Sequence, residues 1–121
     1  MTEAVLVAGG AGYIGAHVCK ALAEAGRLPV VLDDLSTGHR DFVRWGPLVE
    51  AKVTDTDVVR ATLARAKILT VIDLAACIEV GESVRDPLKF YANNLAAKVA
   101  FLAALRDGGV ESIILSSTAA V

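Results

Sequence analysis

The sequence predicts an α/β fold in which helices cover both faces of a parallel sheet. Short apolar and β-branched runs alternate with helical segments, a glycine cluster at 9–15 separates the first run from the first helical segment, and Asp33 ends the second run. Strands that alternate with helices imply parallel pairing. We therefore expect a Rossmann-like, doubly wound sheet with the strand order 3-2-1-4-5 and ligands at the carboxyl ends of the strands.

The elements of the first half follow from periodicity and turn residues. An apolar run predicts a strand over 4–8, and a helical pattern over 13–25 ends at Gly26, which is typical of a helix C-cap. A second strand is predicted over 29–33. A polar loop follows, and then a short helical turn over 40–45 with Trp45 as an apolar anchor.

The second half repeats the alternation. Strands are predicted over 48–51, 69–75 and 113–116, and helices over 57–66 and 88–106. Asp55 is expected to cap the first of these helices, Pro87 lies near the start of the second, and Gly108-Gly109 follow its end. The last strand would be a bare sheet edge unless something covers it, so we expect the chain to be a truncated part of a larger protein.

Composition bounds the class of protein. The chain has 121 residues and a net charge of -2, with 55% hydrophobic and 21% charged residues, which predicts one domain over 1–121 with a large core. A charge this small gives no case for nucleic acid, and no apolar run approaches about 18 residues, so no membrane span is expected. The first strand starts too early for a signal peptide, so we expect a cytoplasmic protein. Cys19 and Cys77 match no metal or redox spacing and are expected to be buried thiols.

The glycine cluster has the pattern of a phosphate cradle. Residues 10–15 satisfy G-x-G-x-x-G, and Gly9, Gly12 and Gly15 also give G-x-x-G-x-x-G. Such glycines allow positive φ, close approach of phosphates and tight packing of the helix on the strand, while amides at the helix start face the anion. The pattern alone also suits any glycine-rich turn. Asp33, 18 residues after Gly15, strengthens the dinucleotide interpretation because an acid there accepts hydrogen bonds from the adenosine ribose.

The same acid predicts NAD rather than NADP as the cofactor. A carboxylate repels a 2′-phosphate, and we expect Asp33 to outweigh Arg40 in the neighbouring loop.

Five segments, in this order and at this spacing, resemble the extended short-chain dehydrogenase/reductase family. They are Gly9 to Gly15, Asp33 with Leu35, Ala76 to Ser83, Tyr91 with Asn93-Asn94, and Ser116 to Val121. Within the family, Val80-Gly81-Glu82-Ser83 favours UDP-hexose 4-epimerases over sugar-nucleotide dehydratases, although closely related epimerases share it. The resemblance implies NAD as cofactor, interconversion of UDP-glucose and UDP-galactose through transient oxidation at the sugar C4, and a homodimer through the helix at 88–106.

The resemblance also implies roles for individual residues. Thr118 matches the catalytic Ser/Thr position, which hydrogen-bonds the sugar hydroxyl. The implied cofactor-binding residues are Gly9, Gly12, Tyr13, Ile14 and Gly15 at the pyrophosphate, Asp33, Asp34, Leu35, Ser36, Thr37 and Gly38 at the adenosine, Val53 against adenine, Leu74, Ala75, Ala76, Cys77 and Ile78 along the cofactor, and Asn93 on the nicotinamide side. The family's reaction also needs a Tyr-x-x-x-Lys pair, which these 121 residues do not contain. We therefore expect the chain to be the cofactor-binding part and to be inactive alone.

Several positions depart from the family pattern, Lys52 and Asp73 among them, and some interpretations stay open. Lys52 replaces an Asp that binds the adenine amino group, and a lysine can only donate hydrogen bonds. Asp73 replaces a common His, and a carboxylate near the pyrophosphate is unfavourable unless it is turned away or paired. Taken alone, Ser116-Ser117-Thr118 suits a plain strand end. The alternatives are another nucleotide-sugar epimerase, a dehydratase or a reductase, or a non-catalytic NAD-binding or interaction module.

Overall fold

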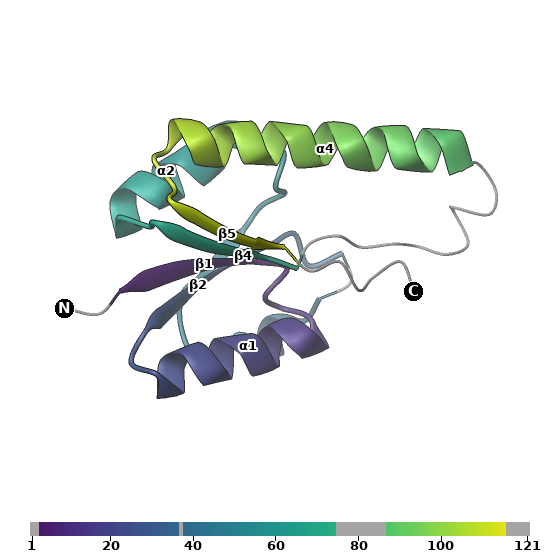
Figure 1. The fold of residues 1–121 in the computed structure, drawn as a ribbon. Coiled ribbons are helices and arrows are strands. Elements are labelled where there is room, and N and C mark those ends of the chain that lie inside the picture. The colour runs from purple at the N-terminus through teal and green to yellow at the C-terminus, as the bar shows by residue number, and fades with distance from the viewer. Residues whose placement is uncertain (1–2, 37, 75–86, 116–121) are drawn as a thin grey trace.

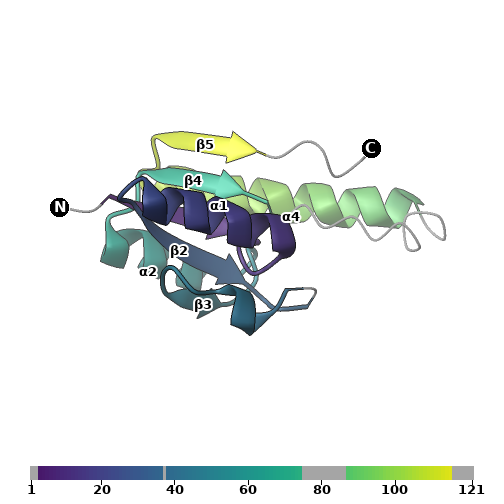
Figure 2. The ribbon, with the colours of Figure 1, turned by 90° about the horizontal axis from the view of Figure 1, so that it is seen from below.

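The computed structural model describes residues 3–36, 38–74 and 87–115, and for 87–94 it describes the backbone alone. Five parallel strands form one sheet in the order β3-β2-β1-β4-β5, which confirms the predicted order (Figures 1 and 2). The elements are β1 (Ala4–Ala8), α1 (Tyr13–Glu24), β2 (Leu28–Asp33), the 3-10 helix η1 (Arg40–Phe42), β3 (Leu48–Glu50), α2 (Thr56–Ala66), β4 (Thr70–Asp73), α4 (Pro87–Asp107) and β5 (Ser112–Leu115). Both ends of every strand and α-helix lie within about two residues of their predicted positions. The exception is η1, which is shorter than the helical turn expected over 40–45.

Helices cover both faces of the sheet, as a doubly wound fold requires. Figure 1 shows α1 on one face and α2 with α4 on the other. All residues of β1 are buried, and its side chains alternate between two apolar clusters. The α2–α4 cluster includes Leu6, Val71 and Phe101, and the α1 cluster includes Val5 and Cys19. The glycine turn after β1 therefore starts from the most buried strand of the sheet.

The Cys19 thiol is buried, as predicted. Desolvation by burial raises the pKa of this thiol to about 11, which keeps it protonated and unreactive at neutral pH. Cys77 lies outside the described residues.

One predicted helix cap is confirmed, and the other is confirmed in its position but not in its side-chain hydrogen bond. Gly26 has φ +80°, and the Arg27 N–H donates to the Leu22 carbonyl at 2.9 Å, which closes the end of α1. Asp55 does occupy the N-cap position of α2, but its side chain caps none of the helix amides. Its Oδ2 instead accepts the Lys52 backbone N–H at 2.9 Å. The carboxylate turns back because the Asp55 N–H already bonds the Lys52 carbonyl at 3.0 Å, closing a tight turn before the helix.

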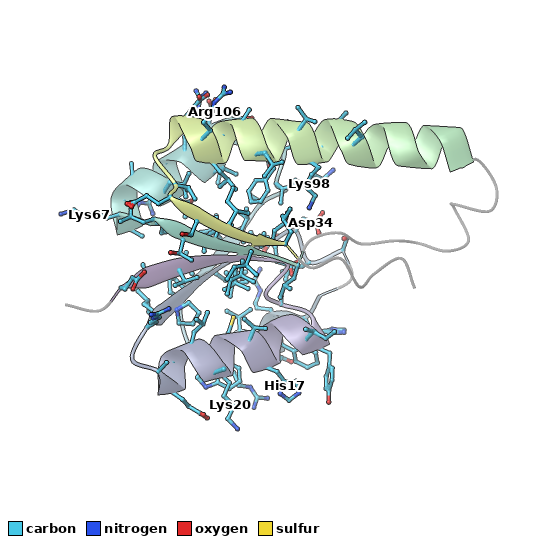
Figure 3. The ribbon with its side chains drawn as sticks, viewed as in Figure 1. His17, Lys20, Asp34, Lys67, Lys98 and Arg106 are labelled. Atoms are coloured by element: carbon cyan, nitrogen blue, oxygen red, sulfur yellow. The ribbon has the colours of Figure 1, made fainter. Side chains whose placement is uncertain are left out.

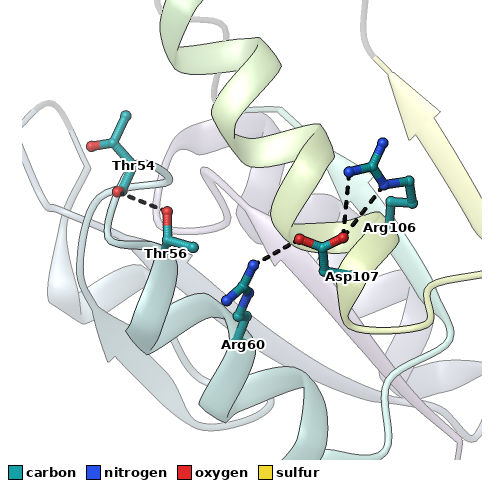
Figure 4. A network of polar contacts seen from close by, with 5 residues as sticks. All are labelled: Thr54, Thr56, Arg60, Arg106 and Asp107. Atoms are coloured by element: carbon teal, nitrogen blue, oxygen red, sulfur yellow. Dashed lines mark hydrogen bonds and ion pairs between the residues drawn. The ribbon is translucent and has the colours of Figure 1, made fainter.

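An exposed polar network joins α2 to the end of α4 (Figure 4). Arg60 Nη2 contacts Asp107 Oδ2 at 2.7 Å, and Arg106 Nη2 contacts Asp107 Oδ1 at 3.4 Å. The hydrogen bond from Arg60 is the main reason why the pKa of Asp107 is lowered. Asp107 precedes β5, so this network lies at the amino edge of the sheet, away from the glycine turn.

The edge strand β5 is poorly covered. All of its residues are exposed, including Ile113, Ile114 and Leu115, as expected for a bare sheet edge. Within the described ranges, no helix combines the length and the apolar character needed to cross a bilayer.

Candidate functional site

Three of the four glycines in the cluster at 9–15 serve different purposes. Gly9 adopts φ +80°, which favours glycine. A Cβ on Gly15 would lie 2.5 Å from the Gly9 carbonyl oxygen, so only glycine lets α1 pack against the turn. Gly12 has an ordinary φ of -82°, and the nearest atom to a Cβ there would be 3.7 Å away. The protein itself therefore imposes no requirement for glycine at position 12, which leaves open space for a ligand beside the backbone.

The N-terminus of α1 faces this open space. No side chain caps it, and its first turn contains no acidic residue. The first amides of any helix lack partners within the helix and carry a partial positive charge. Tyr13 and Ile14 flank the position with exposed fractions of 72% and 63%, and the Tyr13 ring meets the His17 ring edge-on at 4.7 Å between centroids. An anion at this turn would meet free amides and no opposing carboxylate from the first turn.

The Asp33 carboxylate ties the glycine turn to the loop after β2. Oδ2 accepts the Ala11 N–H at 3.0 Å, and Oδ1 accepts the Leu35 N–H at 2.8 Å. The Ala11 carbonyl in turn accepts the His39 N–H at 2.9 Å. Each carboxylate oxygen keeps a second lone pair, so Asp33 can still accept hydroxyl groups of a ligand. This bracing role does not follow from the sequence pattern, because only the bond from Leu35 to Asp33 has the short Asx-type spacing that a sequence reveals.

The loop after β2 is held in a specific conformation. Leu35 has φ 63°, a region that a branched residue enters at a cost of about 1 kcal/mol or more, while its side chain packs on the α1 cluster. Asp34 Oδ1 accepts the Ser36 N–H at 2.9 Å, and this bond is the main reason why the pKa of Asp34 is lowered. Gly38 fits closely, since a Cβ there would lie 2.9 Å from Ala11 Cβ and 3.0 Å from Asp33 Oδ2.

The Asp73 carboxylate forms an ion pair, so it does not stand beside the site as an uncompensated negative charge. Asp73 pairs in register with Ala8, directly before the glycine turn, and its side chain is fully buried. Lys98 reaches from α4 toward the sheet and forms an ion pair with Asp73 Oδ2 (Figure 3). Because Val71 of the same strand packs on the α2–α4 cluster, Asp73 also faces that side. The unfavourable carboxylate anticipated from the sequence is thus neutralised by a residue from a different element.

The structure brings together only part of the predicted site. Val53 packs against the α2–α4 cluster, and Leu74 packs on the α1 cluster, with its N–H bonded to the Ala8 carbonyl at 2.8 Å. Arg40 forms an ion pair with Glu50, so its positive charge is already compensated beside the loop that follows β2. Asn93 lies in α4, in the stretch described by its backbone alone. The predicted residues outside the described ranges are Thr37, Ala75, Ala76, Cys77, Ile78 and Thr118.

Comparison with known proteins identifies the family. Residues 5–121 match the NAD dependent epimerase/dehydratase family. The chain belongs to this family. The membership expected from the five motifs is thereby confirmed, and NAD is the cofactor that the family's description names.

Several proteins that are similar to this chain are UDP-glucose 4-epimerases. The enzyme of Rhizobium leguminosarum bv. trifolii is 48% identical over 118 residues, covering 98% of this chain and 36% of that protein. The crystal structure of UDP-glucose 4-epimerase from Brucella ovis in complex with NAD is 45% identical, with a TM-score of 0.89 over 96% of this chain and 36% of that chain. A structure from Stenotrophomonas maltophila with bound NAD and formylated UDP-arabinopyranose gives 34% identity and a TM-score of 0.89 over 98% of this chain and 38% of that chain. The chain thus spans little more than a third of these relatives' length.

Proposed function

We propose that this chain binds NAD and forms the cofactor-binding part of a UDP-glucose 4-epimerase. The observation that carries the proposal is the open space at Gly12, bounded by the uncapped N-terminus of α1 and by the Asp33 carboxylate. Many relatives of this chain are UDP-glucose 4-epimerases, and solved members of the group hold NAD, which supports the same assignment.

The described residues fit a dinucleotide. A pyrophosphate would lie over Gly12 and accept hydrogen bonds from the first amides of α1. The adenosine ribose would donate to the remaining lone pairs of Asp33, which its bonds to Ala11 and Leu35 already orient. When bound, NAD would supply the redox chemistry at the sugar C4. The chain's own residues bind and orient the cofactor, and the predicted roles of Asn93, Thr118 and residues 75–78 remain part of the proposal.

The cofactor preference tests this proposal. Calorimetric titration of the chain is expected to give at least about tenfold tighter binding of NAD than of NADP, since Asp33 repels a 2′-phosphate. Asp33→Asn should narrow that ratio, because it removes the charge and one of the two acceptors. The matched control is Asp57→Asn, which makes the same charge change at an exposed position of α2, outside the predicted site. Circular dichroism melting checks that both variants fold. Tighter binding of NADP by the unmodified chain would contradict the proposal.

Epimerase turnover should be absent from the same sample. Neither Tyr13 nor Tyr91 is followed by a lysine at the fourth position, where His17 and Leu95 stand instead. Supplied with NAD and UDP-galactose, the 121-residue chain is expected to form no UDP-glucose. Formation of UDP-glucose would show that another pair of residues can perform the proton transfer.

We also propose a homodimer through α4. Leu95 and Val99 lie one turn apart on this helix with exposed fractions of 66% and 57%. Helical periodicity places them opposite Phe101, Ala104 and Leu105, which pack on the core. Leu95→Glu combined with Val99→Glu is expected to convert a dimer to a monomer in sedimentation velocity. The control Leu69→Glu changes an apolar residue of similar exposure outside α4. A chain that is monomeric before mutation, at all concentrations, would contradict this interface.

A further inference from the structure

Three carboxylates lie at the carboxyl edge of the sheet, where a doubly charged pyrophosphate would bind. Asp33 ends β2, Asp34 follows it, and Asp73 ends β4. Asp33 and Asp34 accept backbone N–H groups from nearby residues, while Asp73 forms an ion pair with a side chain of α4. The affinity of this edge for an anion therefore depends on how the charge of Asp73 is compensated.

Asp73 lies beside the strand that leads into the glycine turn. It pairs in register with Ala8, and the Leu74 N–H donates to the Ala8 carbonyl at 2.8 Å. Neighbouring strands are about 4.8 Å apart, so Asp73 lies within about 10 Å of the place assigned to the pyrophosphate. That placement rests on the proposed function. The Asp73 side chain has no exposed surface, and water and salt screen a buried charge less than a surface charge.

Lys98 brings the compensating charge from α4. It lies one turn before Phe101 and two turns before Leu105, both of which are buried, so position 98 continues the stripe of α4 that faces the sheet. Figure 3 shows its side chain directed toward the sheet. The ammonium group forms an ion pair with Asp73 Oδ2, and the lysine side chain is 31% exposed. The two charges of this pair cancel.

We propose that Lys98 determines the affinity of the site for anionic ligands by cancelling the charge of Asp73, without touching the ligand. Relative to the unmodified chain, Lys98→Met makes this position more negative by one charge, and Asp73→Asn makes it more positive by one. The double variant leaves the charge unchanged. These differences hold whatever other groups contact Asp73.

The expected size of the effect follows from Coulomb's law. A unit charge lies about 10 Å from a doubly charged pyrophosphate, at an effective dielectric constant of about 20 and with about one Debye length of salt between them. Such a charge changes the affinity about tenfold. The effect should become smaller as the salt concentration rises.

Calorimetric titration with NAD at about 0.1 M salt compares four forms of the 121-residue chain. Lys98→Met is expected to weaken NAD binding about tenfold, and Asp73→Asn to strengthen it by up to about tenfold. The double variant should bind within about threefold of the unmodified chain. The matched control is Arg106→Met, which removes a cation from another ion pair of α4, exposed and far from Lys98 (Figure 3). It should leave the NAD affinity within about twofold.

The signs of the two single variants separate a charge effect from a structural one. Both variants break the same ion pair, so a pair that only holds the turn in shape would make both bind NAD more weakly. That result, or equal affinities in all four forms, would overturn the inference while leaving NAD binding intact.

A folding control keeps the test decisive. Circular dichroism melting shows which variants are folded at the titration temperature. If Lys98→Met is unfolded there, Asp73→Asn decides alone, since tighter NAD binding supports the inference and equal or weaker binding overturns it. Failure of NAD to bind the folded, unmodified chain would instead remove the proposed function, on which the inference rests.

Discussion

Gly12→Ala is expected to remove measurable NAD binding while changing the free energy of unfolding by less than about 1 kcal/mol. The backbone at position 12 suits alanine, with φ -82° and ψ 178°, and the added methyl group would touch no protein atom closer than 3.7 Å. That methyl group would instead occupy the space assigned to the pyrophosphate. Urea denaturation and calorimetric titration of the same sample measure the two effects.

Gly15→Ala should act in the opposite way, by damaging the fold. Its Cβ would lie 2.5 Å from the Gly9 oxygen and 2.6 Å from Gly10 Cα, and these backbone atoms cannot move without displacing the turn. We expect a loss of about 2–3 kcal/mol in unfolding free energy. The control Gly109→Ala places alanine at φ +81° with no atom within 4 Å, away from the turn, so it should cost about 1 kcal/mol and preserve NAD binding. Wild-type NAD affinity in Gly12→Ala would contradict the placement of the pyrophosphate.

Lys98→Met is expected to lower the free energy of unfolding by about 3 kcal/mol. The substitution takes the ammonium group away from Asp73, whose side chain has no exposed surface, while Lys98 itself is 31% exposed. Removing one partner of a buried carboxylate lowers the free energy of unfolding far more than removing the partner of a carboxylate at the surface. The exposed pair Arg40–Glu50 provides the matched comparison, and Arg40→Met should cost less than about 1 kcal/mol.

A double-mutant cycle assigns the Lys98 effect to the ion pair. Asp73→Asn combined with Lys98→Met should recover part of the stability lost by Lys98→Met alone, because no full charge is then left buried. If Lys98→Met and Arg40→Met lower the free energy of unfolding equally, burial of Asp73 does not make its ion pair more stabilising than an exposed one. An effect of Lys98→Met that is independent of Asp73 would assign it to packing of the lysine stem on α4.

Local patterns were sufficient to predict most of the fold. The run at 4–8 and the helical period after Gly12 depend on neighbouring residues only, so β1 and the start of α1 were predicted at their observed positions. Asp55 shows the limit of such reasoning. Its residue type and position were typical of a helix cap, but the turn before α2 offered its carboxylate the Lys52 amide instead.

The sequence by itself determined the alternation of strands and helices, the glycine turn and the acid that ends β2, because spacing along the chain encodes these features. Only the tertiary structure decided which groups meet. Asp33 and Ala11 lie 22 residues apart, and Lys98 and Asp73 lie 25 apart, so neither contact follows from local periodicity. The distinction between Gly12 and Gly15 likewise depends on atoms that packing places around each Cβ. Long-range packing therefore neutralised Asp73, braced the turn through Asp33 and left open space at Gly12.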